Sequence, residues 1–133
     1  TRLSPRVPEN RRTLIGQEQM EAFAHSSGRF LAFLHYGAKV DASDMEYIIG
    51  YVKGEGRLKV YALDFDRVKP INAYGSGTVA ELEWSIAAEA YFPYPSDEQL
   101  YPRFKSGYLE VAAEMGKADF AGSVIQRYED TAV

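Results

Sequence analysis

Acidic side chains gather at two loop-like points of one stretch of the sequence, residues 35–66. The carboxylates belong to Asp41, Asp44 and Glu46 at its start and to Asp64 and Asp66 at its end. A β-hairpin between the two points would bring them together, and carboxylate oxygens are ligands that divalent cations prefer. We therefore look for chemistry here first, although acidic residues at loop ends commonly stay solvated or cap backbone groups.

His35 begins this stretch, at the end of an amphipathic segment. An imidazole changes its charge near neutral pH, so a histidine delivered to a loop is a candidate proton shuttle. A histidine beside a helix end also commonly caps a carbonyl or packs in a core. Both interpretations of His35 stay open at this stage.

A hairpin is the element that must position the carboxylates. Residues 46–52 and 58–65 are rich in aromatic and β-branched residues, and the glycines of residues 53–56 favour a turn between them. A rival interpretation takes Ser43-x-x-Glu46 as a capping box that opens a helix. The glycines at positions 50, 54 and 56 follow too soon for a stable helix, so we predict the hairpin.

Several segments of this region resemble a fungal family of domains of unknown function, the family numbered 3669 and often loosely labelled "zinc finger protein". The matching segments are Val-Asp-Ala-x-Asp-Met-Glu-Tyr-Ile-Ile-Gly, Leu-Asp-Phe-Asp-Arg-Val-Lys-Pro-Ile and Tyr-Phe-Pro-Tyr-Pro. They occur in the family's order between residues 35 and 108. The zinc label is not carried over, because the chain has no cysteine and this stretch has one histidine.

A more distant resemblance is to protein kinases and aminoglycoside-phosphotransferase-like enzymes. Their catalytic-loop Asp is followed by an Asn at the start of a hairpin that ends in Asp-Phe-Gly, and here Asp41, Glu46 and Asp64-Phe65-Asp66 have similar spacing. The resemblance implies that Asp41 accepts a hydroxyl proton and that Glu46, Asp64 and Asp66 hold Mg²⁺ on the phosphates. His35 is the second candidate catalytic residue.

This second resemblance covers only part of the enzyme fold. Glu46 stands where the metal-binding Asn is expected, and Asp66 replaces the glycine. No Gly-rich phosphate loop followed by a strand lysine precedes His35. The chain therefore resembles a kinase-like C-terminal lobe alone, or a degenerate relative of one.

Helical periodicity dominates the rest of the chain. Apolar residues recur at helical spacing over residues 17–36, where Gly28 weakens the helix and Gly37 is placed for a left-handed cap. A capping box at Thr78-x-x-Glu81 predicts a second helix with an apolar face. A third apolar stripe runs over residues 102–115 and ends at Gly116. A last short helix is marked by Phe120, Val124, Ile125 and Tyr128.

Aromatic residues in the second half of the chain are the candidate partner-binding residues: Trp84, Tyr91, Phe92 and Tyr94. Trp84, the only tryptophan, is either an interface anchor or a core residue, and we favour the core. The proline-interrupted run at 91–95 either displays its rings or wedges two helices apart, and we favour the wedge.

Composition limits the classes of protein to consider. The chain has 133 residues, 46% of them hydrophobic, which suits one domain over residues 14–133 after a flexible basic arm at 1–13. A net charge of −4 gives no reason to expect nucleic-acid or membrane binding. Without a cysteine or a membrane-spanning run, we expect an intracellular protein.

The predicted fold class is α+β, mainly helical, with one β-hairpin packed on a small helical bundle that resembles part of a kinase-like C-lobe. Ile48, Val60, Ala62 and Leu63 are expected to face the helices at 17–36 and 102–115. The predicted function is a non-catalytic protein-interaction module with a protein partner and no cofactor. The alternatives are a phosphotransferase fragment or relative with a Mg²⁺ site, and a small-molecule binder or other enzyme using the acidic cluster. The oligomeric state stays open.

Overall fold

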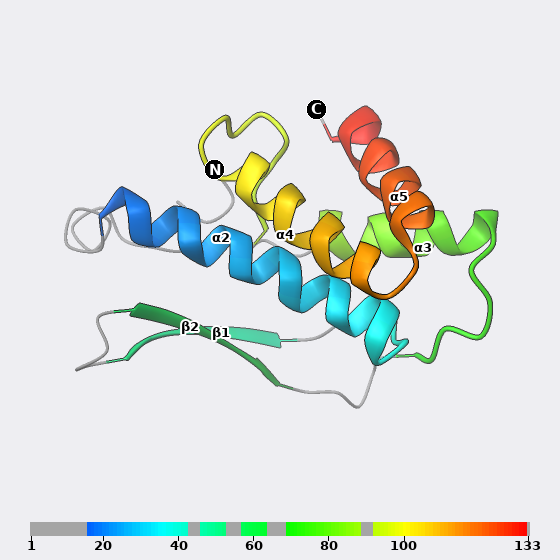
Figure 1. Cartoon of the computed structure of the whole chain (residues 1–133), viewed down its shortest axis with the longest axis horizontal. Coiled ribbons are helices and arrows are strands. Elements are labelled where there is room, and N and C mark those ends of the chain that lie inside the picture. Colours follow the sequence, from blue (N-terminus) through cyan, green and yellow to red (C-terminus); the bar gives the residue numbers. More distant parts are fainter. Residues whose placement is uncertain (1–15, 43–45, 53–56, 64–68, 89–91, 133) are drawn as a thin grey trace.

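The structure, a computed structural model, describes residues 16–42, 46–52, 57–63, 69–88 and 92–132 (Figure 1). The helices are α2 (Gln17–Ala32), α3 (Ser76–Ala87), α4 (Tyr101–Glu114) and α5 (Ala118–Thr131). A π-helical turn, η2 (Phe33–Gly37), continues α2, and two strands follow, β1 (Glu46–Val52) and β2 (Arg57–Leu63). The predicted arm at 1–13 lies outside the described residues.

The two strands form one antiparallel ladder, whose register runs from Glu46 opposite Leu63 to Val52 opposite Arg57. The ladder lies along α2, on the side away from α4 and α5 (Figure 1). Only the backbone of these strands is described. The predicted inward orientation of Ile48, Val60, Ala62 and Leu63 therefore concerns side chains outside the described part of the chain.

The predicted α+β fold class is wrong: the domain is mainly helical. Among the side chains that the structure describes, the core is formed by the helices and the segments that flank them. The physical reason is that a two-stranded ladder offers too little surface to organise a core, whereas four amphipathic helices bury their apolar stripes against one another.

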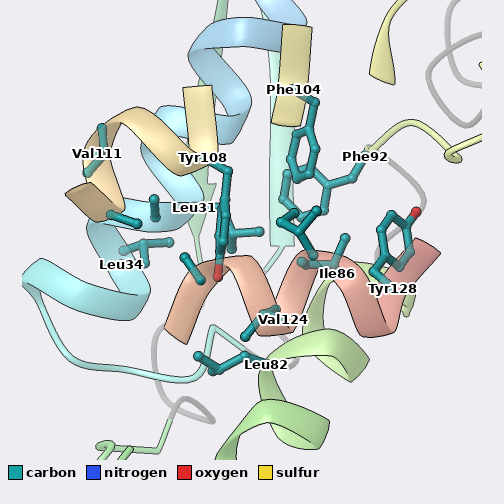
Figure 2. Close-up of a cluster of buried hydrophobic side chains, with 14 of the residues drawn as sticks. Leu31, Leu34, Leu82, Ile86, Phe92, Phe104, Tyr108, Val111, Val124 and Tyr128 are labelled. Atoms are coloured by element: carbon teal, nitrogen blue, oxygen red, sulfur yellow. The ribbon is translucent and has the colours of Figure 1, made fainter. Parts of the chain in front are cut away.

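Aromatic rings from several elements fill this core (Figure 2). Phe104 and Tyr108 of α4 stack with ring centroids 6.2 Å apart, and Phe92 lies 5.1 Å from Phe104. Leu82 of α3 and Val124 of α5 reach the same cluster, and both are fully buried. The apolar stripes predicted for three separate helices thus meet in one place.

α2 and α4 touch through two reciprocal glycines. A Cβ atom added at Gly28 would lie 2.0 Å from the carbonyl oxygen of Phe104, and one added at Gly107 would lie 2.1 Å from the carbonyl oxygen of His25. Both distances are far below van der Waals contact, so only glycine allows the two backbones to approach this closely. Gly28 is therefore a packing requirement, where the sequence alone indicated only a weakened helix.

Two predicted helix boundaries differ in detail. Gly37 belongs to the π-helical turn, and the left-handed residues come later, at Lys39 and Ala42 with φ of 59° and 58°. α3 begins at Ser76, two residues before the predicted cap, and Thr78 Oγ1 accepts a hydrogen bond from the N–H of Gly75 at 3.2 Å. Gly116 does end α4 with a φ of 73°, as predicted.

Candidate functional site

The π-helical turn places His35 at the centre of the molecule. Three consecutive side chains of the turn, those of Leu34, His35 and Tyr36, are buried, and His35 has no exposed surface. Its Nδ1 lies 2.7 Å from the hydroxyl of Tyr108, and its Nε2 lies 3.0 Å from the hydroxyl of Ser85. His35 therefore joins the end of α2 to both α4 and α3.

The hydrogen-bond partners assign a direction to this cluster. The hydroxyl of Ser85 donates to the carbonyl of Leu82 at 2.8 Å, so it accepts from His35 and the ring proton resides on Nε2. Nδ1 then accepts from the hydroxyl of Tyr108, which in turn accepts from the hydroxyl of Tyr36 at 2.7 Å. Every polar atom in the chain of bonds is satisfied with His35 neutral.

Burial fixes the protonation states. It lowers the pKa of His35 to about 3, against the smaller opposing effect of a hydrogen bond to the backbone of Asp41 and of its carboxylate charge. Burial also raises the pKa of Tyr108 well above its ordinary value and raises that of Tyr36. These shifts favour the uncharged forms of all three side chains near neutral pH.

Asp41, the other predicted catalytic residue, lies near His35 and is 7% exposed. Its Oδ1 accepts a hydrogen bond from the N–H of Lys69 at 2.9 Å, and its own N–H donates to the Lys69 carbonyl at 3.0 Å. The structure thus brings the two predicted catalytic residues together, with Asp41 tying two backbone segments to each other.

The predicted metal ligands lie outside the described side chains. Glu46 is described only through its backbone in β1, and Asp44, Asp64 and Asp66 are not described. Convergence of these carboxylates therefore stays a prediction. Within the described residues, no group of three histidine or acidic side chains is arranged to hold a metal ion.

The predicted partner-binding residues have different environments. Trp84 is 64% exposed on α3 and Tyr94 is 41% exposed, whereas Phe92 is buried against Phe104. Tyr91 lies outside the described residues. Our preference for Trp84 as a core residue is wrong, because it lies about 200° around the helix from Leu82, which points into the core.

The environments of four residues, two buried and polar and two exposed and apolar, were not predicted from the sequence. Tyr108 and Ser85 lie on helical faces that otherwise carry apolar residues, and a polar atom at such a position was the available signal of a buried hydrogen bond. Phe33 and Met115 are 49% and 41% exposed, although Met115 was predicted to belong to an apolar core stripe.

A shallow groove of about 620 Å³ lies on the surface of α5. Polar side chains line most of it, including Asp119, Gln126 and Arg127.

None of the helices described is both long and apolar enough to cross a lipid bilayer. Comparison with protein-family models, curated proteins and solved structures finds no match to this chain. The chain therefore presents a mainly helical domain with a sealed polar centre.

Proposed function

We propose that this chain is a non-catalytic protein-interaction module, and that it binds its partner through the outer face of α3. We define this face by Ala80, Glu81, Trp84 and Ala88. The observation that carries the proposal is the 64% exposure of Trp84, the only tryptophan of the chain.

The outer face suits a partner because small alanine side chains lie beside one large exposed ring. Leu82, Ser85 and Ile86 point into the core from the opposite side of α3, so the helix has apolar residues on both sides. Tryptophan is also the residue type most enriched among those that dominate binding energy at protein interfaces.

The state of His35 supports a non-catalytic role. A proton shuttle needs access to its substrate and a pKa near the working pH, whereas this imidazole is sealed and its pKa is lowered to about 3. Both ring nitrogens are already engaged, by Tyr108 and Ser85. We therefore assign His35 to the stability of the fold.

The proposal includes descent from a kinase-like C-lobe. It is supported by the order of the elements, because the β1–β2 ladder follows Asp41 and precedes Asp64 along the chain. Thermal unfolding with Mg²⁺, Mn²⁺ and ATP tests whether a phosphotransferase site persists. A ligand at about a hundred times its dissociation constant raises the free energy of unfolding by roughly 2.7 kcal/mol. We expect no shift, and a shift that Asp64→Ala abolishes would instead favour the enzyme.

Retention of proteins from a cell extract on the immobilised chain tests the interaction surface. Wild type, Trp84→Ser and Phe33→Ser are compared, the last as a matched control because Phe33 is also a half-exposed aromatic residue. We expect at least one protein to be retained by wild type and Phe33→Ser and lost with Trp84→Ser. Once purified, the retained protein should shift the fluorescence emission of Trp84 to shorter wavelength when it binds, since binding removes water from the indole. Absence of any Trp84-dependent protein, with the variant still folded, contradicts the proposal.

A further inference from the structure

We propose that the β1–β2 ladder opens as a separate unit while the helices stay folded, and that a clasp centred on Asp41 sets how often it opens. We call this clasp the base clasp and define it by Val40, Asp41, Lys69 and Pro70. It is a conformational device of the fold, and the proposal does not rest on the function proposed above.

The base clasp joins the two chain segments that flank the ladder in the sequence. Val40 and Pro70 form an antiparallel bridge. Beside it, the N–H of Asp41 donates to the carbonyl of Lys69 at 3.0 Å, and Oδ1 of Asp41 accepts from the N–H of Lys69 at 2.9 Å. Because β1 and β2 both lie between Asp41 and Lys69, these bonds close the loop of chain that carries the ladder.

The base clasp is also anchored to the helical part of the molecule. The N–H of Val40 donates to the carbonyl of Leu34 in the π-helical turn at 2.9 Å, and the hydroxyl of Tyr74 donates to the carbonyl of His35 at 2.6 Å. Ile71, the residue that follows the clasp, belongs to the buried core. Opening of the ladder can therefore stop at the clasp and leave these anchoring contacts in place.

Among the elements that the structure describes, few hold the ladder. β1 pairs with β2, and the main contact of β2 outside the ladder is with α2 (Figure 1). α4, by contrast, packs on both α2 and α5, and α5 also packs on α3. A two-stranded ladder is marginally stable by itself. A unit held by few contacts opens at a lower free energy than the whole domain needs to unfold.

Backbone strain lies next to the base clasp, on the side of β1. Ala42 directly follows Asp41 and has a φ of 58°, in the left-handed region that residues with a Cβ atom avoid. Such a conformation persists only where the surrounding contacts impose it. The bonds of Asp41 to Lys69 are the nearest of these contacts. Opening of the clasp releases the strain at Ala42, which favours the open form.

Native-state hydrogen exchange of the full chain, followed by NMR under conditions in which the exchange rate reports the opening equilibrium, tests this proposal. Amides of β1 and β2 report on the ladder, and amides of buried α4 residues such as Tyr108 and Val111 report on unfolding of the helices. We expect the amides that bond across the ladder to share one protection factor, lower than that of the α4 amides by about tenfold or more.

Two variants separate the ladder from the helices. Ile125→Val shortens a side chain in the core that is 2% exposed, and it weakens the helices whether the ladder is open or closed. It should speed exchange of the α4 amides about fivefold and leave the strand amides unchanged. Asp41→Ala removes an acceptor from the closed form alone, so both classes of amide should exchange faster by one common factor of about ten. Asp41→Asn keeps the Oδ1 acceptor and should change both classes less.

Other results overturn the proposal. Equal acceleration of strand and α4 amides by Ile125→Val would show that the ladder and the helices unfold as one unit. Strand amides that do not respond to Asp41→Ala would show that they exchange by fraying, without the base clasp. Failure of Asp41→Ala to fold would also contradict the proposal, because the helices are expected to stay folded when the clasp is open.

Discussion

The contact between α2 and α4 and the contact of both helices with α3 are built on different principles. α2 and α4 meet through the absence of side chains at Gly28 and Gly107, which lets backbone touch backbone. α3 meets them through a hydrogen-bonded chain in which His35 joins Ser85 to Tyr108. The first contact depends mainly on shape, whereas the second depends on shape and on protonation.

Ion pairs along the α2–α4 contact add little to this difference. Glu110 accepts hydrogen bonds from His25 at 2.7 Å and Arg29 at 2.6 Å, but all three side chains are more than a third exposed. Exposed pairs of this kind contribute little to the free energy of unfolding, because water and salt screen them. The glycines and the buried cluster should therefore respond to mutation far more strongly than these charges.

Gly107→Ala should have the largest effect. The new methyl group meets the His25 carbonyl and the backbone of Arg29, which cannot move aside as a side chain could. We expect the free energy of unfolding to fall by about 3 kcal/mol or more, at the upper end of the overpacking range. Urea denaturation followed by circular dichroism measures the change.

Gly122→Ala is the matched control, since Gly122 also lies in a helix but has nothing within 4 Å of an added Cβ atom. Alanine there should stabilise the protein by up to about 1 kcal/mol. Equal responses of the two glycines would show that close approach of α2 and α4 is not what Gly107 provides.

His35→Leu should rank second. Leucine keeps most of the volume but leaves the hydroxyl of Tyr108 without its acceptor and that of Ser85 without its donor. An unsatisfied buried polar group costs about 1–3 kcal/mol, so we expect a loss of roughly 2–4 kcal/mol in urea denaturation. His25→Gln, at a partly exposed position, should cost less than about 1 kcal/mol. A similar loss in both variants would contradict the importance of the buried cluster.

Acid should lower the free energy of unfolding through His35, which joins α3 to α2 and α4, and not through the contact between Gly28 and Gly107. The unfolded chain protonates His35 near its ordinary pKa of 6.5, whereas burial holds the folded pKa at about 3. Between these values the unfolded state binds more protons, so the free energy of unfolding falls as the pH falls, by about 1.4 kcal/mol per pH unit. We expect a loss of roughly 2 kcal/mol between pH 6.5 and pH 5, measured by urea denaturation.

The His35→Leu variant separates this effect from other titrations. It should lose most of the pH dependence between pH 6.5 and pH 5, while Gly107→Ala keeps it. Carboxylates with lowered pKa values, such as that of Glu129, add their own destabilisation at lower pH. A wild-type protein of constant stability across this interval would show that folded His35 takes up a proton as readily as the unfolded chain.

Tyr36→Phe should have the smallest effect of the series. The Tyr36 hydroxyl ends the chain of bonds by donating to Tyr108, which keeps His35 as its own acceptor. Loss of one such bond should cost about 1 kcal/mol. A loss as large as that of His35→Leu would instead make Tyr36 a necessary member of the cluster. Thermal denaturation compares the two variants directly.

Local patterns in the sequence located most of the helices. The apolar stripe over residues 17–36 corresponds to α2 and its π-helical turn, and the stripe over 102–115 corresponds to α4 within one residue at each end. Gly116 marks the end of α4 because a left-handed residue there favours glycine. The α+β class failed because strand-like composition at two runs says nothing about which elements supply the core.

The candidate sites were predicted less well, because they depend on partners distant in the chain. Trp84 and Leu82 lie two positions apart on the same helix, and the exposure of one and burial of the other follow from what covers each side of α3. The role of Glu46, Asp64 and Asp66 as metal ligands stays a prediction, because their side chains lie outside the described part of the chain.

The sequence by itself determined where the chain forms helices, because helical periodicity and glycine stop signals act within a few residues. Tertiary structure decided what those helices do. Gly28 weakens an isolated helix, yet it permits a backbone contact with Phe104, far along the chain. His35 would titrate near neutral pH in a loop, yet burial against Tyr108 and Ser85 keeps it neutral. Both outcomes depend on which surfaces meet, and packing between distant segments determines that.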